Sequence, residues 1–130
     1  MPTRILVPSG VLGLGFDGQA LERGLELRPD IICIDGGSTD SGPFYLGTGS
    51  SKYANEIYKS EWRELMIARE RGGIPLVLSS CGTCGTNSMV DLMYELTKEI
   101  AKDLKQNIKV ALLYSDQSIE YVIVAFNASK

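Results

Sequence analysis

Short apolar runs alternate with longer segments of helical period along most of this chain. The apolar runs are Arg4–Val7, Asp30–Ile34, Pro75–Leu78 and Lys109–Tyr114. Apolar side chains at three- and four-residue spacing predict amphipathic helices between them, at Gly18–Leu27, Tyr53–Arg71 and Ser88–Lys105. Runs so short and so uniformly apolar are typical of strands that are buried on both faces of a parallel sheet. The order β-α-β-α-β-α-β therefore predicts a doubly wound α/β sheet with right-handed crossovers.

The end of the chain departs from this alternation. Glu120–Phe126, extended by Ile119, is a further apolar run, but only residues 115–118 separate it from Lys109–Tyr114. Two consecutive strands can pair in parallel only when about a dozen residues or more connect them. We therefore expect these two runs to form an antiparallel hairpin at one edge of the otherwise parallel sheet.

Local signals bound the two longer helices and indicate which face is buried. Gly72 and Gly73 are expected to end the second helix, and Ser88 is expected to cap the start of the third. Trp62 and Met66 belong to one apolar stripe, which favours a place in the core over a cofactor site.

Composition limits the function classes open to this chain. It has no histidine, so it holds neither a Ser-His-Asp triad nor a histidine-built zinc or iron site. Its 13 Lys and Arg against 16 Asp and Glu include no basic cluster, which disfavours a nucleic-acid partner. No leader segment or membrane span is visible, and three cysteines are no disulfide framework, so we expect a cytoplasmic protein without a membrane partner. The length of 130 residues suits one α/β domain over residues 1–130.

The residues that follow the first three strands are rich in glycine and hydroxyl side chains. Eleven of the 14 glycines lie in the segments 9–18, 35–51 and 79–87, whereas the turns at the other strand ends are short. Ligands of open α/β sheets gather at the carboxyl ends of the strands, where backbone N–H groups attract anions. We therefore expect the three loops to form one binding site. Its candidate ligand-binding residues are Ser9, Gly10, Gly13, Gly15, Gly36, Gly37, Ser38, Thr39, Ser80, Gly82 and Asp116.

The first loop contains a phrase of the dinucleotide type. From Gly13 it reads G-L-G-F-D-G, which fits GxGxxG, and Asp35 closes the second strand about 20 residues further on. Asp35 nevertheless opens a long glycine-rich loop, unlike the usual ribose-binding arrangement. A nicotinamide or flavin site is therefore one alternative, a tight glycine turn is the other, and the cofactor stays unknown.

The second loop holds two carboxylates, Asp35 and Asp40, close to a strand end. A structureless loop of about fifteen residues or more in a compact domain usually has a function. These two side chains could orient a substrate, bind a hard cation or act as a general base, and they are our candidate catalytic residues. The structural alternative is that each caps a turn, as aspartate beside glycine and serine often does.

The third loop carries a C-x-x-C motif, Cys81-Gly-Thr-Cys84, at a strand-to-helix junction. A helix N-terminus nearby lowers a thiol pKa, so the motif makes both cysteines candidates for redox chemistry. The motif supplies only two thiolates, and Cys33 is predicted to be buried in a strand, so no complete zinc site is expected. The structural alternative is that both are small residues of a tight loop.

The segment Asp35–Gly49, DGGSTDSGPFYLGTG, resembles the glycine- and aspartate-rich signature of the acyclic terpene utilisation (AtuA-like) family. Val7–Phe16 resembles the start of those proteins, Ser79–Gly85 lies where they carry small residues, and the resemblance covers about residues 4–116. It implies a Rossmann-like, three-layer α/β/α domain in a cytoplasmic catabolic context, in some members the degradation of terpenoid acids through acyl-CoA intermediates. Because those proteins are generally several times longer, it also implies that this chain corresponds to their N-terminal portion. Residues Ile119–Lys130 and the paired cysteines depart from the family pattern.

Three functional hypotheses follow. The first is a site for a small anionic metabolite, bearing a carboxylate or a phosphate, in a catabolic enzyme whose reaction is undefined; Asp35 and Asp40 would position or activate that metabolite. The second is a non-catalytic module that pairs with its own copies or with a longer partner subunit through the hairpin at Lys109–Phe126. The third is a dithiol oxidoreductase that uses Cys81 and Cys84.

Overall fold

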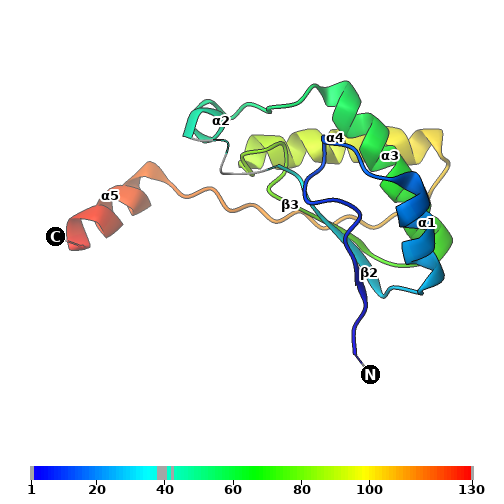
Figure 1. The fold of residues 1–130 in the computed structure, drawn as a ribbon. Coiled ribbons are helices and arrows are strands. Elements are labelled where there is room, and N and C mark those ends of the chain that lie inside the picture. The colour runs from blue at the N-terminus through cyan, green and yellow to red at the C-terminus, as the bar shows by residue number, and fades with distance from the viewer. Residues whose placement is uncertain (1, 38–40, 42, 130) are drawn as a thin grey trace.

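The computed structural model describes residues 2–37, 41 and 43–129. The elements follow in the order β1 (Ile5–Leu6), α1 (Gly18–Glu26), β2 (Ile31–Asp35), α2 (Pro43–Thr48), α3 (Asn55–Gly72), β3 (Leu76–Ser79), α4 (Asn87–Asp103) and α5 (Ile119–Ala128) (Figure 1). The mixed α/β class is confirmed, and the first three predicted strands and the three predicted helices all form close to their expected ranges.

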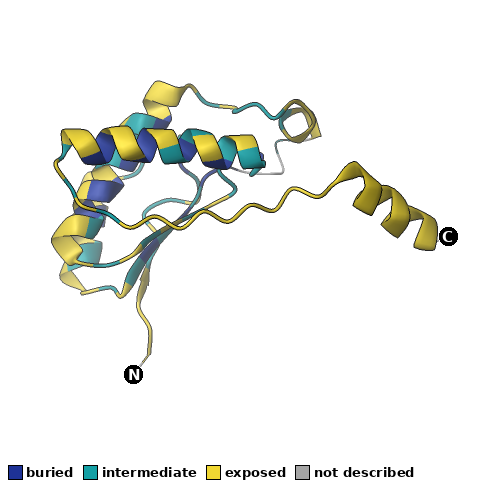
Figure 2. Cartoon of the chain, turned by 180° about the vertical axis from the view of Figure 1, so that it is seen from behind, coloured by how far each residue is buried: buried dark blue, intermediate teal, exposed yellow. Residues whose placement is uncertain are grey.

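The three strands form a parallel sheet in the order β1-β2-β3. Ile5 lies opposite Ile31 in the first pair of strands, and Asp35 lies opposite Ser79 at the end of the second pair. Each crossover thus moves one strand further in the same direction. Right-handed crossovers that all step the same way put their helices on the same face of the sheet. Helices α1, α3 and α4 accordingly lie on one side of it (Figures 1 and 2).

The core lies between the sheet and these helices. It is one cluster, to which the central strand and the helices contribute Leu21, Ile32, Ile34, Tyr58, Trp62, Leu65, Met66, Met93, Leu96 and Ile100. Polar side chains in this core are paired: Trp62 Nε1, for example, donates a hydrogen bond to Thr97 Oγ1 at 2.8 Å. The apolar stripe with Trp62 and Met66 is therefore part of the core, as the sequence pattern predicts.

The opposite face of the sheet is apolar and open. Ile5 and Val77 are 60% and 46% exposed, and Ile31 and Cys33 on the same face are half-buried. The part of the chain that the structure describes therefore forms two layers, with helices on one face of the sheet only. Cys33, expected inside the core, lies on the open face instead.

The predicted C-terminal hairpin is wrong. Residues 107–118 are extended but pair with no strand among the described residues, and Ile119–Ala128 is a helix. The extended segment is held by α4 rather than by the sheet, since Tyr114 Oη donates to Asp91 Oδ1 at 2.5 Å. Ser118 is the N-cap of this helix, and its Oγ accepts a hydrogen bond from Tyr121 N at 3.1 Å.

Two smaller expectations also fail. The second loop is not structureless, because Pro43–Thr48 forms the short helix α2 within it. The N-cap of α4 is Thr86, two residues before the expected Ser88, and the Thr86 side chain makes no capping hydrogen bond. No helix among the described residues is long and apolar enough to cross a bilayer.

The packing of the core predicts how much free energy of unfolding is lost when a cavity is made in it. Leu65 of α3 is completely buried, so Leu65→Ala should lower the free energy of unfolding by about 2–5 kcal/mol in urea titrations followed by circular dichroism. The matched control is Leu46→Ala in α2, where the side chain is 62% exposed and the loss should stay within about 0.5 kcal/mol. Equal losses at the two positions would contradict the burial described here.

Candidate functional site

The three glycine-rich loops meet at the carboxyl edge of the sheet. The backbone N–H of Leu12 in the first loop donates to the carbonyl of Asp35 at 2.7 Å. Gly36 N donates to the Ser79 carbonyl at 2.6 Å, and Thr83 N donates back to the Gly36 carbonyl at 3.2 Å. Main-chain hydrogen bonds thus join all three loops into one layer, which we call the rim.

Glycine at positions 36 and 37 is required by this close approach of the loops. A Cβ on Gly36 would lie 2.5 Å from the Ser79 carbonyl oxygen, and a Cβ on Gly37 would lie 2.0 Å from Thr83 Cα. Gly37 also has φ of +157°, a value that residues other than glycine rarely adopt. Packing between loops therefore explains these two glycines without any ligand.

Thr83 is a buried and strained residue at the centre of the rim. Its φ of 79° is unusual for a β-branched residue. Its Oγ1 lies 3.0 Å from Tyr58 Oη and accepts a hydrogen bond from Lys52 N at 3.1 Å. This hydroxyl therefore ties the third loop to α3 and to the end of the second loop, which compensates part of the backbone strain.

The first loop already receives a carboxylate from its own chain. Glu61 of α3, which is half-buried, accepts hydrogen bonds from Gly13 N at 2.7 Å and from Gly15 N at 2.8 Å. Both glycines have positive φ, which turns their amides toward the carboxylate. The loop is thus shaped to bind a carboxylate, and two of the amides expected to receive a ligand are occupied by Glu61.

Of the two candidate catalytic carboxylates, the structure places one. Asp35 ends β2, where its Oδ1 accepts a hydrogen bond from Gly37 N at 3.1 Å and lies 3.5 Å from Ser79 Oγ. The contact with Gly37 is the turn-capping role that the sequence left open as an alternative. Asp40, together with Ser38 and Thr39, lies outside the described residues.

The remaining candidate ligand-binding residues border the same edge. Ser9 Oγ donates to the Val11 carbonyl at 3.3 Å, and Gly10 is exposed with open space around it. Ser80 is half-buried, and Gly82 packs against Met89.

Asp116 lies at the first turn of α4. Its Oδ2 accepts a hydrogen bond from Asn87 N at 3.0 Å, and its own N donates to Asn87 Oδ1 at 3.3 Å. Asp116 therefore satisfies a free amide at the start of the helix, as an N-terminal acid does, and it holds the extended segment in place.

One cation borders the rim. Lys52 is exposed at the end of the second loop, where its Nζ donates to Ser41 Oγ at 3.2 Å and lies 5.8 Å from the ring centroid of Tyr53. It therefore offers a positive charge beside the polar loops.

The C-x-x-C motif contains one half-buried thiol, Cys81, and one buried thiol, Cys84. All three cysteines are free thiols, and Cys84 is buried with its Sγ 3.4 Å from Thr86 Oγ1. Burial raises the pKa of the Cys81 thiol, which reduces the fraction of reactive thiolate at neutral pH. These contacts favour the structural alternative for the motif. No cluster of three or more His, Cys, Asp or Glu side chains suited to a metal ion occurs in the described part of the chain.

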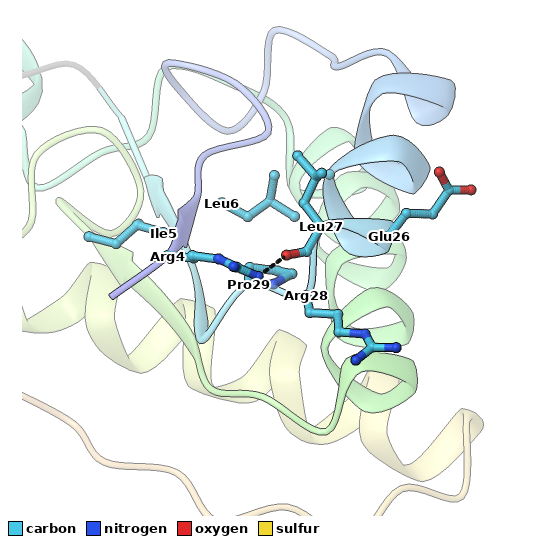
Figure 3. A pocket seen from close by; sticks show the side chains of 8 residues that line it. Arg4, Ile5, Leu6, Glu26, Leu27, Arg28 and Pro29 are labelled. Carbon is cyan, nitrogen blue, oxygen red and sulfur yellow. Dashed lines mark hydrogen bonds between the residues drawn. The ribbon is translucent and has the colours of Figure 1, made fainter. Parts of the chain in front are cut away.

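One hollow on the surface lies away from the rim. It is an open depression of about 640 Å³ at the amino-terminal edge of the sheet, lined by Arg4, Ile5, Leu6, Gly24, Glu26, Leu27, Arg28 and Pro29 (Figure 3). One of its charges is already engaged, since Arg4 donates from its guanidinium to the Leu27 carbonyl at 2.8 Å. Ligands of parallel sheets bind at the carboxyl edge, so this hollow is a weaker candidate than the rim.

Comparison with protein-family models found no matching family, and comparisons with curated proteins and with solved structures found no significant match.

Sequence reasoning missed the residues that organise the rim. Glu61 stands on the charged side of α3, and nothing in its spacing indicates that it folds over the first loop. Thr83 and Tyr58 meet across 25 residues, and only the register of the loops brings them together. The sequence offers one signal of a carboxylate partner. It is the set of glycines in the first loop, which implies that backbone amides there are turned outward.

The loop packing predicts a large difference between two glycine substitutions. Gly37→Ala should destabilise the fold by about 1–3 kcal/mol or more, since the new methyl group meets backbone atoms that cannot move aside. The matched control Gly10→Ala should be close to neutral, because nothing lies within 4 Å of that position. Thermal unfolding of both variants measures the difference, and a neutral Gly37→Ala would show that the loops do not pack as described.

The raised pKa of Cys81 predicts slow alkylation. Iodoacetamide reacts with thiolates, so Cys81 in the folded chain should react more slowly at neutral pH than in the chain unfolded by urea. Peptide mass spectrometry measures the rate, and the urea-unfolded chain is the control. The rate in the folded chain should rise only at more alkaline pH than in that control. Faster reaction in the folded chain would restore the oxidoreductase hypothesis.

Proposed function

We propose that the chain binds a small anionic metabolite, bearing a carboxylate or a phosphate, at the rim. The observation that carries this proposal is the convergence of the three loops at the carboxyl edge of a parallel sheet. Their amides and hydroxyl groups lie where ligands of such sheets bind. No reaction is assigned, because the contacts around Asp35 support a role in holding the second loop.

Charge and loop shape support an anion. Lys52 supplies the positive charge beside the rim, and the first loop already holds one carboxylate, that of Glu61. A ligand carboxylate would make the same two charge-assisted hydrogen bonds if Glu61 turned away. Alternatively, the ligand binds between Lys52 and the half-buried Ser80, without displacing Glu61.

The wider context is part of the same proposal. Resemblance to the AtuA-like family over Asp35–Gly49 favours a carboxylic acid or an acyl-CoA ester as the metabolite and a catabolic enzyme as the setting. Three free thiols suit a reducing cytoplasm. A Rossmann-like, three-layer arrangement would be reached when a further layer covers the open face of the sheet.

Titration with defined probes tests the proposal. Inorganic phosphate, citrate and an acyl-CoA analogue are added separately to the labelled chain, and amide chemical shifts and melting temperatures are recorded. At least one probe should raise the melting temperature and shift amides within 9–15, 35–41 and 79–86. Lys52→Met should weaken that binding about tenfold, the loss of roughly 1.4 kcal/mol.

The matched control is Lys98→Met, which removes an exposed lysine of α4 that pairs with Glu95 away from the rim. Its affinity should equal that of the parent chain. If no probe shifts rim amides, or if both lysine variants bind equally well, the rim is not an anion site.

A further inference from the structure

Two apolar surfaces are exposed within the described residues. The first is the open face of the sheet, formed by Ile5, Val7, Ile31, Cys33 and Val77. The second is α5, where Tyr121, Val122, Ile123 and Val124 are each more than half exposed and Glu120 is the only charged side chain. A parallel sheet is normally covered on both faces, and a helix that is apolar on all sides is normally buried. We therefore expect each of the two surfaces to pack against another apolar surface.

The chain's own α5 cannot reach its own open face. The two hydrogen bonds between Asp116 and Asn87 fix the extended segment at the start of α4, on the side of the sheet that the helices cover. Only Gln117 and Ser118 follow before α5, and three extended steps span about 10 Å at most. Passing from one helix layer to the other side of a sheet takes roughly 20 Å, since layers pack about 10 Å apart. Figures 1 and 2 show α5 projecting away from the sheet.

The two surfaces match each other in size and chemistry. A helix of 10 residues is about 15 Å long, and three strands side by side are about 14 Å wide. The charged side chains of the two surfaces lie at their ends: Glu120 at the start of α5 and Asp35 at the end of β2. A reciprocal exchange between two copies would hide on the order of 1,000 Å², at the lower limit for a specific interface. Such an exchange is closed by a two-fold axis and leaves neither surface open.

We propose that two copies of this chain form a dimer in which α5 of each copy packs on the open sheet face of the other. Each sheet then gains the second helix layer that the fold otherwise lacks. The Asp116–Asn87 contact is the element that selects the partner's sheet over the chain's own.

Sedimentation velocity over a range of micromolar concentrations tests the dimer. The parent chain should sediment as a species of twice 14.2 kDa. Ile123→Asp on α5 and Val77→Asp on the sheet should each weaken dimerisation at least about 100-fold, because each puts a charge into the apolar contact. The matched control is Leu113→Asp in the extended segment, where the side chain is 86% exposed and belongs to neither surface. A monomeric parent chain, or a control variant that dissociates as readily as the other two, would overturn the proposal.

A disulfide distinguishes this dimer from other arrangements. Cys33 lies on the open face, so in a chain with Cys81→Ser and Cys84→Ser the further change Ile123→Cys creates one pair of thiols in each of the two symmetric contacts. Mild oxidation should then give a covalent dimer on a non-reducing gel, whereas the same chain without Ile123→Cys should stay monomeric there. Circular dichroism checks that each variant folds. A disulfide within one chain, or a dimer that forms no disulfide, would overturn the exchange of α5.

Discussion

Most of this structure follows from the order in which successive strands are added to the sheet. The strands lie in the order β1-β2-β3, so each crossover connection moves one strand further in the same direction. Both strand pairs are parallel, which brings the three carboxyl ends to one edge, where the loops join through main-chain hydrogen bonds. The repeated step in one direction puts α1, α3 and α4 on one face and leaves the other face apolar and open. The rim and the open face are thus two consequences of one topology.

The parts of the fold that follow from local periodicity could be predicted from the sequence. Strands β1, β2 and β3 and helices α3 and α4 each have a strong pattern, and α1 has a weaker one that Gly24 interrupts; the core stripe with Trp62 follows from the same spacing. The strand order could not be predicted, because an alternating pattern is equally compatible with a sheet that grows in both directions. The three-layer expectation assumed such a reversal, and for this reason the open face was unexpected.

The final segment shows how far β-propensity depends on a neighbouring strand. Ile119–Phe126 is rich in β-branched and aromatic residues, which favoured a strand. A strand needs a partner, however, and residues 107–118 are held along α4 by Tyr114 and Asp116. Without an edge to join, the segment satisfies its backbone internally as a helix that begins at the Ser118 cap. The position of residues 107–118 therefore outweighed the β-propensity of Ile119–Phe126.

The glycines of the rim have two different causes, and separating them narrows the search for a ligand. Gly36 and Gly37 are needed because the second and third loops approach each other too closely for a Cβ. Gly13 and Gly15 turn their amides toward a carboxylate, which Glu61 supplies. Sequence alone treats all four alike, as a site for an anion. Among the described residues, the first loop holds a carboxylate through two glycine amides, so a ligand carboxylate at those amides would compete with Glu61, whereas Lys52 offers a positive charge to an anion elsewhere on the rim.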